Sequence, residues 1–275
     1  MANLADTARR SAQEPSRAGV ELGAWPERWL PAFVVVAGLL LWEWSARAGR
    51  ISTLFFPAPS FIARTLLRLI RSGKVALHLG ASLSRLLAGF ALGAIPGLVL
   101  GILVGWSRRL RVIVDPLIAA AHPIPKLSLL PLIMIIFGIG EASKVVTIAV
   151  VCFFPMLIGS MAAVREIPPI YFEVAENYGA GLRRLFTRVV APATLPLVLN
   201  TVRVSLNTAL ILTMAVELVA SQTGLGYLIW FAWQTLRTEE LYATLTVTAL
   251  LGIGINEVLQ RLTKALVPWQ VERKR

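Results

Sequence analysis

The chain has 275 residues, of which 56% are hydrophobic and 15% charged, and its formal net charge is +12. A soluble domain usually carries about 25% charged residues, so this composition excludes an ordinary soluble protein and favours a helical membrane protein. The excess of positive charge does not indicate a nucleic-acid-binding protein, because the Lys and Arg residues lie at the ends of apolar stretches instead of on one soluble segment.

The sequence lacks the residues that a disulfide, a metal site or a nucleotide-binding loop would need. A single cysteine, Cys152, cannot form an internal disulfide. His78 and His122 are too few and too far apart for a metal site. The chain also has no Gly-x-x-x-x-Gly-Lys-Ser/Thr run that would bind the phosphates of a nucleotide. We therefore expect no metal, no cofactor and no catalytic residue.

The amino-terminal part begins with a polar tail. Residues 1–28 mix Arg with Asp and Glu and contain no apolar core, which predicts a cytoplasmic tail and not a cleavable signal. Residues 30–47 are the first expected membrane span. After a rigid Pro-Ala-Pro segment, residues 61–72 predict an amphipathic helix, too short to cross a bilayer and expected to lie in the membrane interface.

The second expected span, residues 78–106, has a glycine at every fourth position. Such a repeat leaves one ridge of the helix without side chains, because residues four apart lie on nearly the same face. We expect this ridge to let the backbone of another helix approach closely. Its members are Gly89, Gly93, Gly97, Gly101 and Gly105.

The third expected span, residues 116–137, is interrupted by prolines at positions 123, 125 and 131. A broken helix survives in a membrane only where it is buried in protein or lines a cavity. Lys126 lies in the break, and two interpretations stay open: a cation that extends its amine to the cytoplasmic membrane surface, or a residue with a role in coupling. A short turn then leads to the fourth expected span, residues 144–164.

A polar and basic segment, residues 165–192, lies between two apolar spans. Its residues 173–178 predict a short helix that Gly179 and Gly181 break, because glycine adopts backbone angles closed to other residues. Residues 182–190 predict a second short helix that Pro192 ends or redirects. This helix–glycine–helix arrangement offers a surface to another protein; the alternative is an ordinary solvated loop.

The fifth expected span, residues 195–220, includes the polar residues Arg203, Asn207 and Glu217. Arg203 and Glu217 lie roughly 21 Å apart along a helix and cannot pair with each other, so each needs a partner elsewhere or a path to water. For Arg203, extension to the cytoplasmic surface is an equal alternative. We expect Glu217 to accept hydrogen bonds from the backbone of the turn at 221–227.

The sixth expected span, residues 241–262, follows an aromatic segment at 221–240, and residues 271–275 form a second cytoplasmic tail. Six spans with the amino terminus inside place more Lys and Arg residues in cytoplasmic segments than outside, as the positive-inside rule requires. The basic helix at 61–72 runs against this orientation, which leaves the side of the first crossing open.

The 165–192 segment resembles the cytoplasmic signature loop of ATP-binding-cassette importer permeases. The signature reads Glu-Ala-Ala, three residues, Gly, nine residues, Ile, one residue, Leu-Pro. It falls here on Glu173, Val174, Ala175, Gly179, Val189, Ala191 and Pro192. Three apolar residues differ from those of the signature and keep its apolar character.

Four further stretches extend the resemblance over residues 56–269, and it is strongest to the nitrate, sulfonate and taurine branch of these permeases. The stretches are Phe56 to Ser60, Ile124 to Leu132, Phe137 to Lys144 and Gly224 to Tyr227. The resemblance implies the type I importer permease fold, all-α with about six membrane helices over residues 29–270. It also implies that residues 165–192 couple the chain to a separate ATPase.

The coupling residues implied by this resemblance are Glu173, Ala175, Glu176, Tyr178, Gly179, Ala180 and Pro192. The implied partners are a second copy of the chain in a homodimer, two cytoplasmic ATPase subunits and an extracytoplasmic solute-binding protein, all at a bacterial inner membrane. ATP would be hydrolysed by the partner and not by this chain. The candidates for the translocation path or its gate are Lys126, Arg203, Asn207 and Glu217.

Two other functions are weighed against the importer. A gradient-driven secondary transporter or channel needs ion-binding carboxylates in the middle of the membrane, for which only Glu217 and Glu43 qualify. A membrane-embedded enzyme needs a cluster of acidic residues and histidines or a nucleophile with its base, which the sequence does not offer. The substrate stays open among sulfonates, taurine, nitrate and related small anions.

Overall fold

The computed structural model describes residues 29–269, which contain helices and no β-strand. The chain divides into two compact units, residues 1–51 and 52–275. The described part of the first unit is helix α2 (Leu30–Arg47), whose apolar side chains are largely exposed. A Glu43–Arg47 ion pair of 2.5 Å lies at its last turn. Both predicted tails, 1–28 and 271–275, lie outside the described residues.

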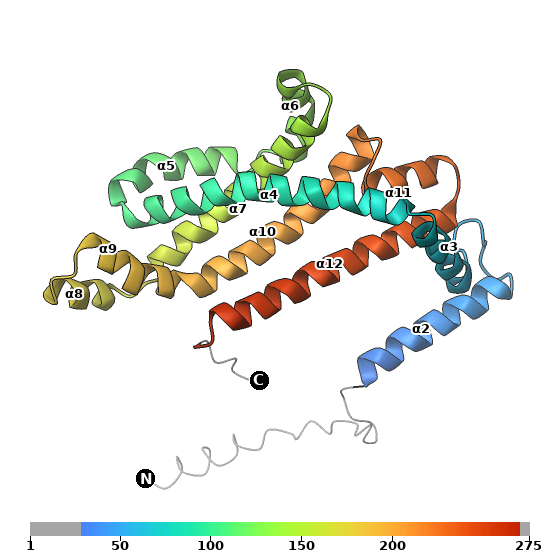
Figure 1. Cartoon of the computed structure of the whole chain (residues 1–275), viewed down its shortest axis with the longest axis horizontal. Helices are drawn as coiled ribbons and strands as arrows, with labels where there is room; N and C mark the ends of the chain where they lie inside the picture. The colour runs from blue at the N-terminus through green and yellow to red at the C-terminus, as the bar shows by residue number, and fades with distance from the viewer. Residues whose placement is uncertain (1–28, 270–275) are drawn as a thin grey trace, which may run out of the picture. The chain divides into compact units, whose positions relative to one another are not determined.

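The second unit is a bundle of helices (Figure 1). Its α-helices are α3 (Pro59–Arg71), α4 (Lys74–Trp106), α5 (Arg108–Ala121), α6 (Leu130–Phe137), α7 (Glu141–Arg165), α8 (Pro169–Asn177), α9 (Leu182–Leu185), α10 (Ala191–Ala220), α11 (Leu225–Gln234) and α12 (Thr238–Leu266). A 3₁₀ turn, Lys126–Leu129, precedes α6, and a π-helical turn, Phe186–Val190, joins α9 to α10.

The core of this unit forms where α4, α7 and α10 lie side by side and where α11 and α12 close against α10 (Figure 1). Buried apolar residues from all five helices meet there. They include Leu86, Ile148, Cys152, Ala209, Leu225 and Val247. This packing fixes the positions of the two ends of α4, where the candidate sites described below are found.

The side chains on the outer surface of the helices are apolar, as contact with the hydrocarbon core of a bilayer requires. Ile135, Val219 and Ile211 are 81%, 74% and 72% exposed. Among the described residues, five helices are long and apolar enough to cross a membrane, and the bent pair 108–121 and 126–137 makes up to six. This confirms the predicted all-α membrane fold with about six membrane helices.

The third predicted span differs from the structure. It was expected as one interrupted helix at 116–137, but two helical pieces, Arg108–Ala121 and Lys126–Phe137, meet at 86°. The first piece begins already at Arg108, because the Ser107 hydroxyl accepts a hydrogen bond from the Leu110 amide (3.3 Å). Two closely spaced prolines, Pro123 and Pro125, then lack amide donors, and the backbone leaves the helical region at Pro125, where ψ is 107°.

The predicted end of a helix at Pro192 is wrong. Residues 182–220 form one continuous helical rod, and Pro192 lies in the first turn of α10. A proline inside a helix clashes with the carbonyl four residues earlier and lacks an amide donor. Here the wider π-helical turn at Phe186–Val190 comes directly before it and relieves that conflict.

The predicted amphipathic helix is α3. Its Thr65 hydroxyl donates to Glu239 at the start of α12 (2.8 Å), and Arg68 lies 3.9 Å from Glu240. These contacts tie α3 to α12. Its placement in the membrane interface stays a prediction.

Candidate functional site

The predicted helix–glycine–helix segment consists of α8, the turn at 178–181 and α9, and we refer to residues 169–185 as the knuckle. Gly179 has φ +65°, in the left-handed region that side chains disfavour. The Gly179 amide donates to the Glu176 carbonyl (2.8 Å), and the Ala180 amide donates to the Ala175 carbonyl (2.9 Å). This pair of bonds is the Schellman motif that ends a helix at a left-handed glycine.

The knuckle exposes apolar side chains to an unusual degree for a polar segment. Tyr178 is 87% exposed, Leu182 77% and Tyr171 57%. The candidates Glu173 and Glu176 are exposed as well, whereas Ala175 and Ala180 are half-buried. Exposed aromatic and aliphatic side chains beside charged ones are typical of protein-binding surfaces.

The glycine ridge of α4 lies against α7. A side chain added at Gly97 would come within 2.6 Å of the Phe153 carbonyl oxygen, and one at Gly89 within 2.6 Å of Ile148. The other three ridge glycines, Gly93, Gly101 and Gly105, face α7 in the same way. We refer to this contact as the glycine seam. It is the close helix approach that the four-residue spacing predicts.

The seam shows that α4 and α7 run parallel, because successive glycines meet successive turns of α7. At 1.5 Å per residue, the stretch from Arg85 to Gly105 spans roughly 30 Å, about the thickness of the hydrocarbon core. The knuckle follows the carboxyl end of α7. The residues around Arg85 therefore lie at the opposite end of the seam from the knuckle.

Arg85 is the buried centre of an ionic network at that opposite end. Only 3% of the residue is exposed, and all five of its N–H donors are used. Its Nη1 donates to Glu217 Oε1 and to the Thr223 carbonyl, both at 2.7 Å. Its Nε and Nη2 hold Glu141 in a two-pronged contact of 2.5 and 2.8 Å, and Nη2 also donates to the Thr223 hydroxyl (2.6 Å).

Glu217 is the deepest member of this network and is fully buried. Besides Arg85, its carboxylate accepts from the Ser82 hydroxyl (2.7 Å) and from the Gly226 amide (2.9 Å). The predicted hydrogen bond from the backbone of the 221–227 turn is therefore present. A carboxylate with three hydrogen-bond donors, one of them a buried cation, is stable in an apolar environment that an isolated carboxylate could not occupy.

The network is electrically neutral. The Lys144 amine donates to Glu141 Oε1 (2.8 Å) and to the Ser221 hydroxyl (3.2 Å). Two cations, Arg85 and Lys144, thus face two carboxylates, Glu141 and Glu217. We refer to these four residues as the four-charge network. It joins the first half of α4, the start of α7 and the end of α10.

The turn that follows α10 is pinned to α4 by the same cluster. The Leu225 amide donates to the Ser82 hydroxyl (2.8 Å), and the Gly224 amide donates to His78 Nδ1 (3.0 Å). Gly224 has φ +113°, and a side chain there would run into the Glu217 carboxylate. The turn therefore depends on glycine both for its backbone angles and for its closeness to Glu217.

The four predicted path or gate residues do not form one cluster. Among the described residues, no hydrogen bond or ion pair joins any two of Lys126, Arg203, Asn207 and Glu217. Asn207 instead exchanges two amide hydrogen bonds with Asn256 of α12, at 3.1 and 3.0 Å.

Lys126 and Arg203 have separate environments. Lys126 donates to the His122 carbonyl, and its amine lies 5.3 Å from the centre of the Phe154 ring. This contact connects the bend between α5 and α6 to α7. Arg203 is half-buried and forms no ion pair with any described residue.

Most of the four-charge network was not predicted from the sequence. Glu217 was a candidate, but Arg85, Glu141 and Lys144 were not predicted as its neighbours. The available signal was the unusual position of Arg85 inside a long apolar span, since a buried cation needs an anion from another helix. Which helix supplies that anion depends on helix register, which the sequence does not contain.

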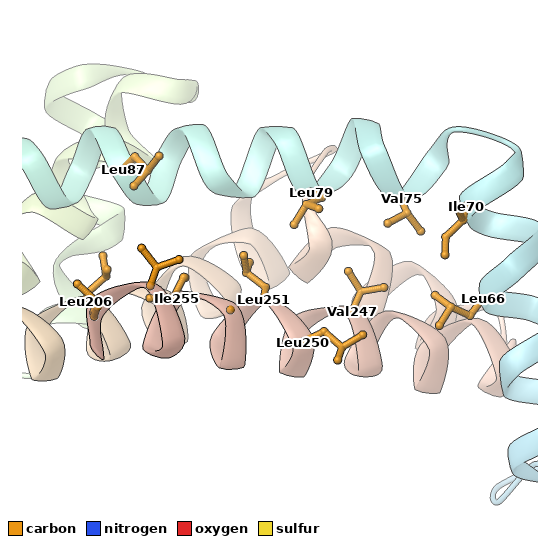
Figure 2. Close-up of a pocket in the computed structure, with 13 residues that line it drawn as sticks. Leu66, Ile70, Val75, Leu79, Leu87, Leu206, Val247, Leu250, Leu251 and Ile255 are labelled. Atoms are coloured by element: carbon orange, nitrogen blue, oxygen red, sulfur yellow. The ribbon is translucent and has the colours of Figure 1, made fainter. Parts of the chain in front are cut away.

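An apolar pocket of about 600 Å³ lies between α3, α4, α10 and α12. Figure 2 shows Val75 and Leu79 of α4 facing Val247 and Leu251 of α12 across it. All thirteen lining residues are glycine or aliphatic. A pocket without donors or cations cannot recognise an anion, so this one does not qualify as a binding site for such a substrate.

The chain resembles known proteins in both sequence and fold. Residues 97–271 match the family described as "Binding-protein-dependent transport system inner membrane component". The putative aliphatic sulfonates transport permease protein SsuC of Bacillus subtilis is 33% identical over 241 residues, covering 88% of this chain and 86% of the relative. The taurine transport system permease protein TauC of Escherichia coli is 31% identical, covering 85% and 87%.

A solved structure, an inward-facing conformation of the MetNI methionine ABC transporter, shares the fold. Its matching chain is 21% identical, with a TM-score of 0.62 over 68% of this chain and 93% of that one. The fold is therefore that of type I importer permeases. Together with the family match over most of the helical bundle, this establishes that the chain belongs to the binding-protein-dependent transport inner membrane components, the permease subunits of ATP-binding-cassette transporters.

Proposed function

We propose that this chain forms, with a second copy of itself, the translocation path of an ATP-driven importer for small organic sulfonates. Two cytoplasmic ATPase subunits dock on the knuckles and hydrolyse the ATP, and a solute-binding protein delivers substrate from the other side of a bacterial inner membrane. The sulfonate class rests on the names of the relatives, one for aliphatic sulfonates and one for taurine. Family membership favours this function over a gradient-driven carrier.

The observation that carries the proposal is the connection between the knuckle and the four-charge network. The rod at 182–220 begins in the knuckle and ends three residues after Glu217. Its length from residue 190 to 217 is roughly 40 Å, enough to cross a bilayer. A movement imposed on the knuckle by the ATPase therefore reaches the 221–227 turn through one continuous element.

The network gives that movement a defined end point. The turn at 221–227 is fixed by Ser82, His78 and Arg85 of α4 and by Glu217 of α10. A shift of α10 against α4 must therefore break or carry with it several charge-assisted hydrogen bonds. Such bonds favour discrete arrangements over continuous sliding, which suits a gate with two states. We assign the network this gating role.

The roles of the other candidates follow from their places. We assign Asn207 to the contact of α10 with α12, because both of its amide bonds go to Asn256. We keep Arg203 and Lys126 as candidate path residues, since Arg203 is a half-buried cation one turn from Asn207 and Lys126 lies at the bend between α5 and α6. A cation is the appropriate group to attract a sulfonate.

The test is transport by a reconstituted system of this chain, its ATPase and its binding protein in liposomes. We expect ATP-dependent uptake of taurine or a short alkanesulfonate that requires the loaded binding protein. Uptake driven by a proton or sodium gradient in the absence of ATP would contradict the importer. ATP-dependent uptake of an unrelated solute, with no response to any sulfonate, would retain the importer and refute the substrate class.

A further inference from the structure

A second, polar pocket of about 370 Å³ lies at the knuckle end of the glycine seam. The last turns of α4 and α7, the first turn of α5 and the start of α8 form its walls. Its volume lies within the range of small-molecule sites, roughly 300–1,000 Å³. Unlike the aliphatic pocket, it has two arginines in its lining, Arg111 and Arg165, together with the aromatic side chains of Trp106 and Phe172.

A hydrogen bond holds the Arg111 side chain in place, but one of its buried donors has no acceptor within residues 29–269. Its Nη2 donates to the Gly105 carbonyl at the end of α4 (2.6 Å), which fixes the direction of the side chain. Its Nε is buried and has no hydrogen-bond partner among the described residues. A buried donor without an acceptor is costly, and in native structures such a group calls for a missing partner.

The positive charge of the pocket is not neutralised by the neighbouring carboxylates. Arg165, the last residue of α7, forms no ion pair within the described part of the chain, and neither does Arg111. Asp115 lies one turn after Arg111 on α5, and Glu166 follows Arg165 directly, yet neither carboxylate pairs with either arginine in the described residues. Two guanidinium groups therefore line one small pocket with their charge available.

We propose that this pocket binds a phosphate oxyanion, supplied either by the headgroup of an anionic phospholipid or by a soluble phosphate. The planar donor fork of arginine matches the oxygens of phosphate, and two such forks around one site select for that geometry. The pocket lies at the end of two membrane helices, where an indole such as that of Trp106 also prefers to lie. Basic pockets between membrane helices on the cytoplasmic side suit anionic lipid headgroups.

The pocket lies at the base of the knuckle, so a ligand bound in it would affect how firmly the knuckle is held. Ile167 and Phe172 also line the pocket, and they pack with Val164 and Val190 in a small apolar cluster at the base of the knuckle. Trp106 stacks on Phe186 of the π-helical turn, with ring centres 6.4 Å apart. A bound phosphate thus bridges α5 and α7 beside the elements that carry the knuckle, and it holds that base together.

The test uses the purified full-length chain and two probes. In one arm, native mass spectrometry follows the binding of phosphatidylglycerol, with zwitterionic phosphatidylcholine as comparison. In the other arm, calorimetry follows the binding of inorganic phosphate. Both binding measurements are made on Arg111→Gln, on Arg165→Gln and on the matched control Arg109→Gln. The control removes an exposed arginine of α5 that does not line the pocket.

We expect one of the probes to bind, with an affinity that falls roughly tenfold in Arg111→Gln and in Arg165→Gln and stays unchanged in Arg109→Gln. Selective binding of phosphatidylglycerol assigns the site to lipid, and binding of inorganic phosphate assigns it to a soluble ligand. Equal losses of affinity in all three variants would show that the probe is attracted only by the general positive charge of this surface, and would overturn the proposal. Absence of binding, together with loss of the ATPase from complexes of Arg111→Gln, would overturn it in favour of a carboxylate on the protein partner.

Discussion

Arg85 and Glu217 form a salt bridge of 2.7 Å, although 132 positions separate them in the chain and both are at least 97% buried. The pair ties the first half of α4 to the carboxyl-terminal end of α10, at the opposite end of the seam from the knuckle. Removing one member leaves the four-charge network with an unbalanced charge, whereas removing both keeps it neutral.

Glu217→Ala is the first prediction. We expect it to lower the free energy of unfolding of the purified protein by about 3–5 kcal/mol, because Arg85, Ser82 and the Gly226 amide lose an acceptor together. Glu217→Gln keeps the size and an acceptor oxygen, and we expect it to lose less stability and to retain most transport. Thermal unfolding and uptake measure the two effects. Complete loss of uptake in both variants would indicate an obligatory negative charge and contradict the gating role.

A double variant separates charge pairing from simple packing. Arg85→Met with Glu217→Met leaves the Lys144–Glu141 pair, which is neutral by itself. We therefore expect the double variant to be more stable than the sum of the two single losses predicts, with a coupling of about 1–3 kcal/mol. Strict additivity would show that the two side chains do not depend on each other.

The glycine seam offers a matched comparison on one helix. In Gly97→Ala the new methyl group would meet the Phe153 carbonyl, so we expect a loss of about 1–3 kcal/mol and a disturbed contact of α4 with α7. Gly80→Ala places the same group on the same helix with nothing within 4 Å. We expect it to be neutral or to stabilise by up to about 1 kcal/mol. Equal melting temperatures for the two variants would contradict the packing argument.

The left-handed conformation of Gly179 predicts a difference between two substitutions that fit the available space equally. No atom lies within 4 Å of a Cβ at this position, so the backbone angle decides the outcome. Asn tolerates φ near +65° and Val does not. We expect Gly179→Asn to keep ATP-driven transport, and Gly179→Val to insert normally but to lose coupling of ATP hydrolysis to uptake. Full uptake by the valine variant would show that this turn is not needed.

The parts of this structure that the sequence predicts depend on local chemistry. The spacing of Gly93 and Gly97 indicates a bare helix ridge whatever helix lies against it. Gly179 indicates a left-handed turn because few other residues adopt one. The fold class followed from apolar stretches of bilayer length, and the family from the signature around Glu173.

The parts that it missed depend on relations between distant segments. Arg85 meets Glu217 only because the seam sets the register of α4 against α7 and α10, and that register is a property of the packed bundle. The end of a helix expected at Pro192 failed for a related reason, since a π-helical turn at 186–190 lets the helix continue. The 86° bend after residue 121 shows that closely spaced prolines can redirect a span.

The most direct test of the central claim is a cross-link between the knuckle and the ATPase. Cys152 is the one cysteine of the chain and is fully buried, so Cys152→Ala gives a background without thiols. In it, Tyr178→Cys places a thiol at an 87% exposed position of the knuckle, and Ile139→Cys places one at an 86% exposed position beside the four-charge network. In a co-purified complex, a maleimide–benzophenone cross-linker, which attaches to the thiol and on illumination inserts into a nearby C–H bond, should join position 178 to the ATPase subunit and leave position 139 unlinked. A cross-link from position 139, or none from position 178, would contradict the assignment of the knuckle as the coupling element.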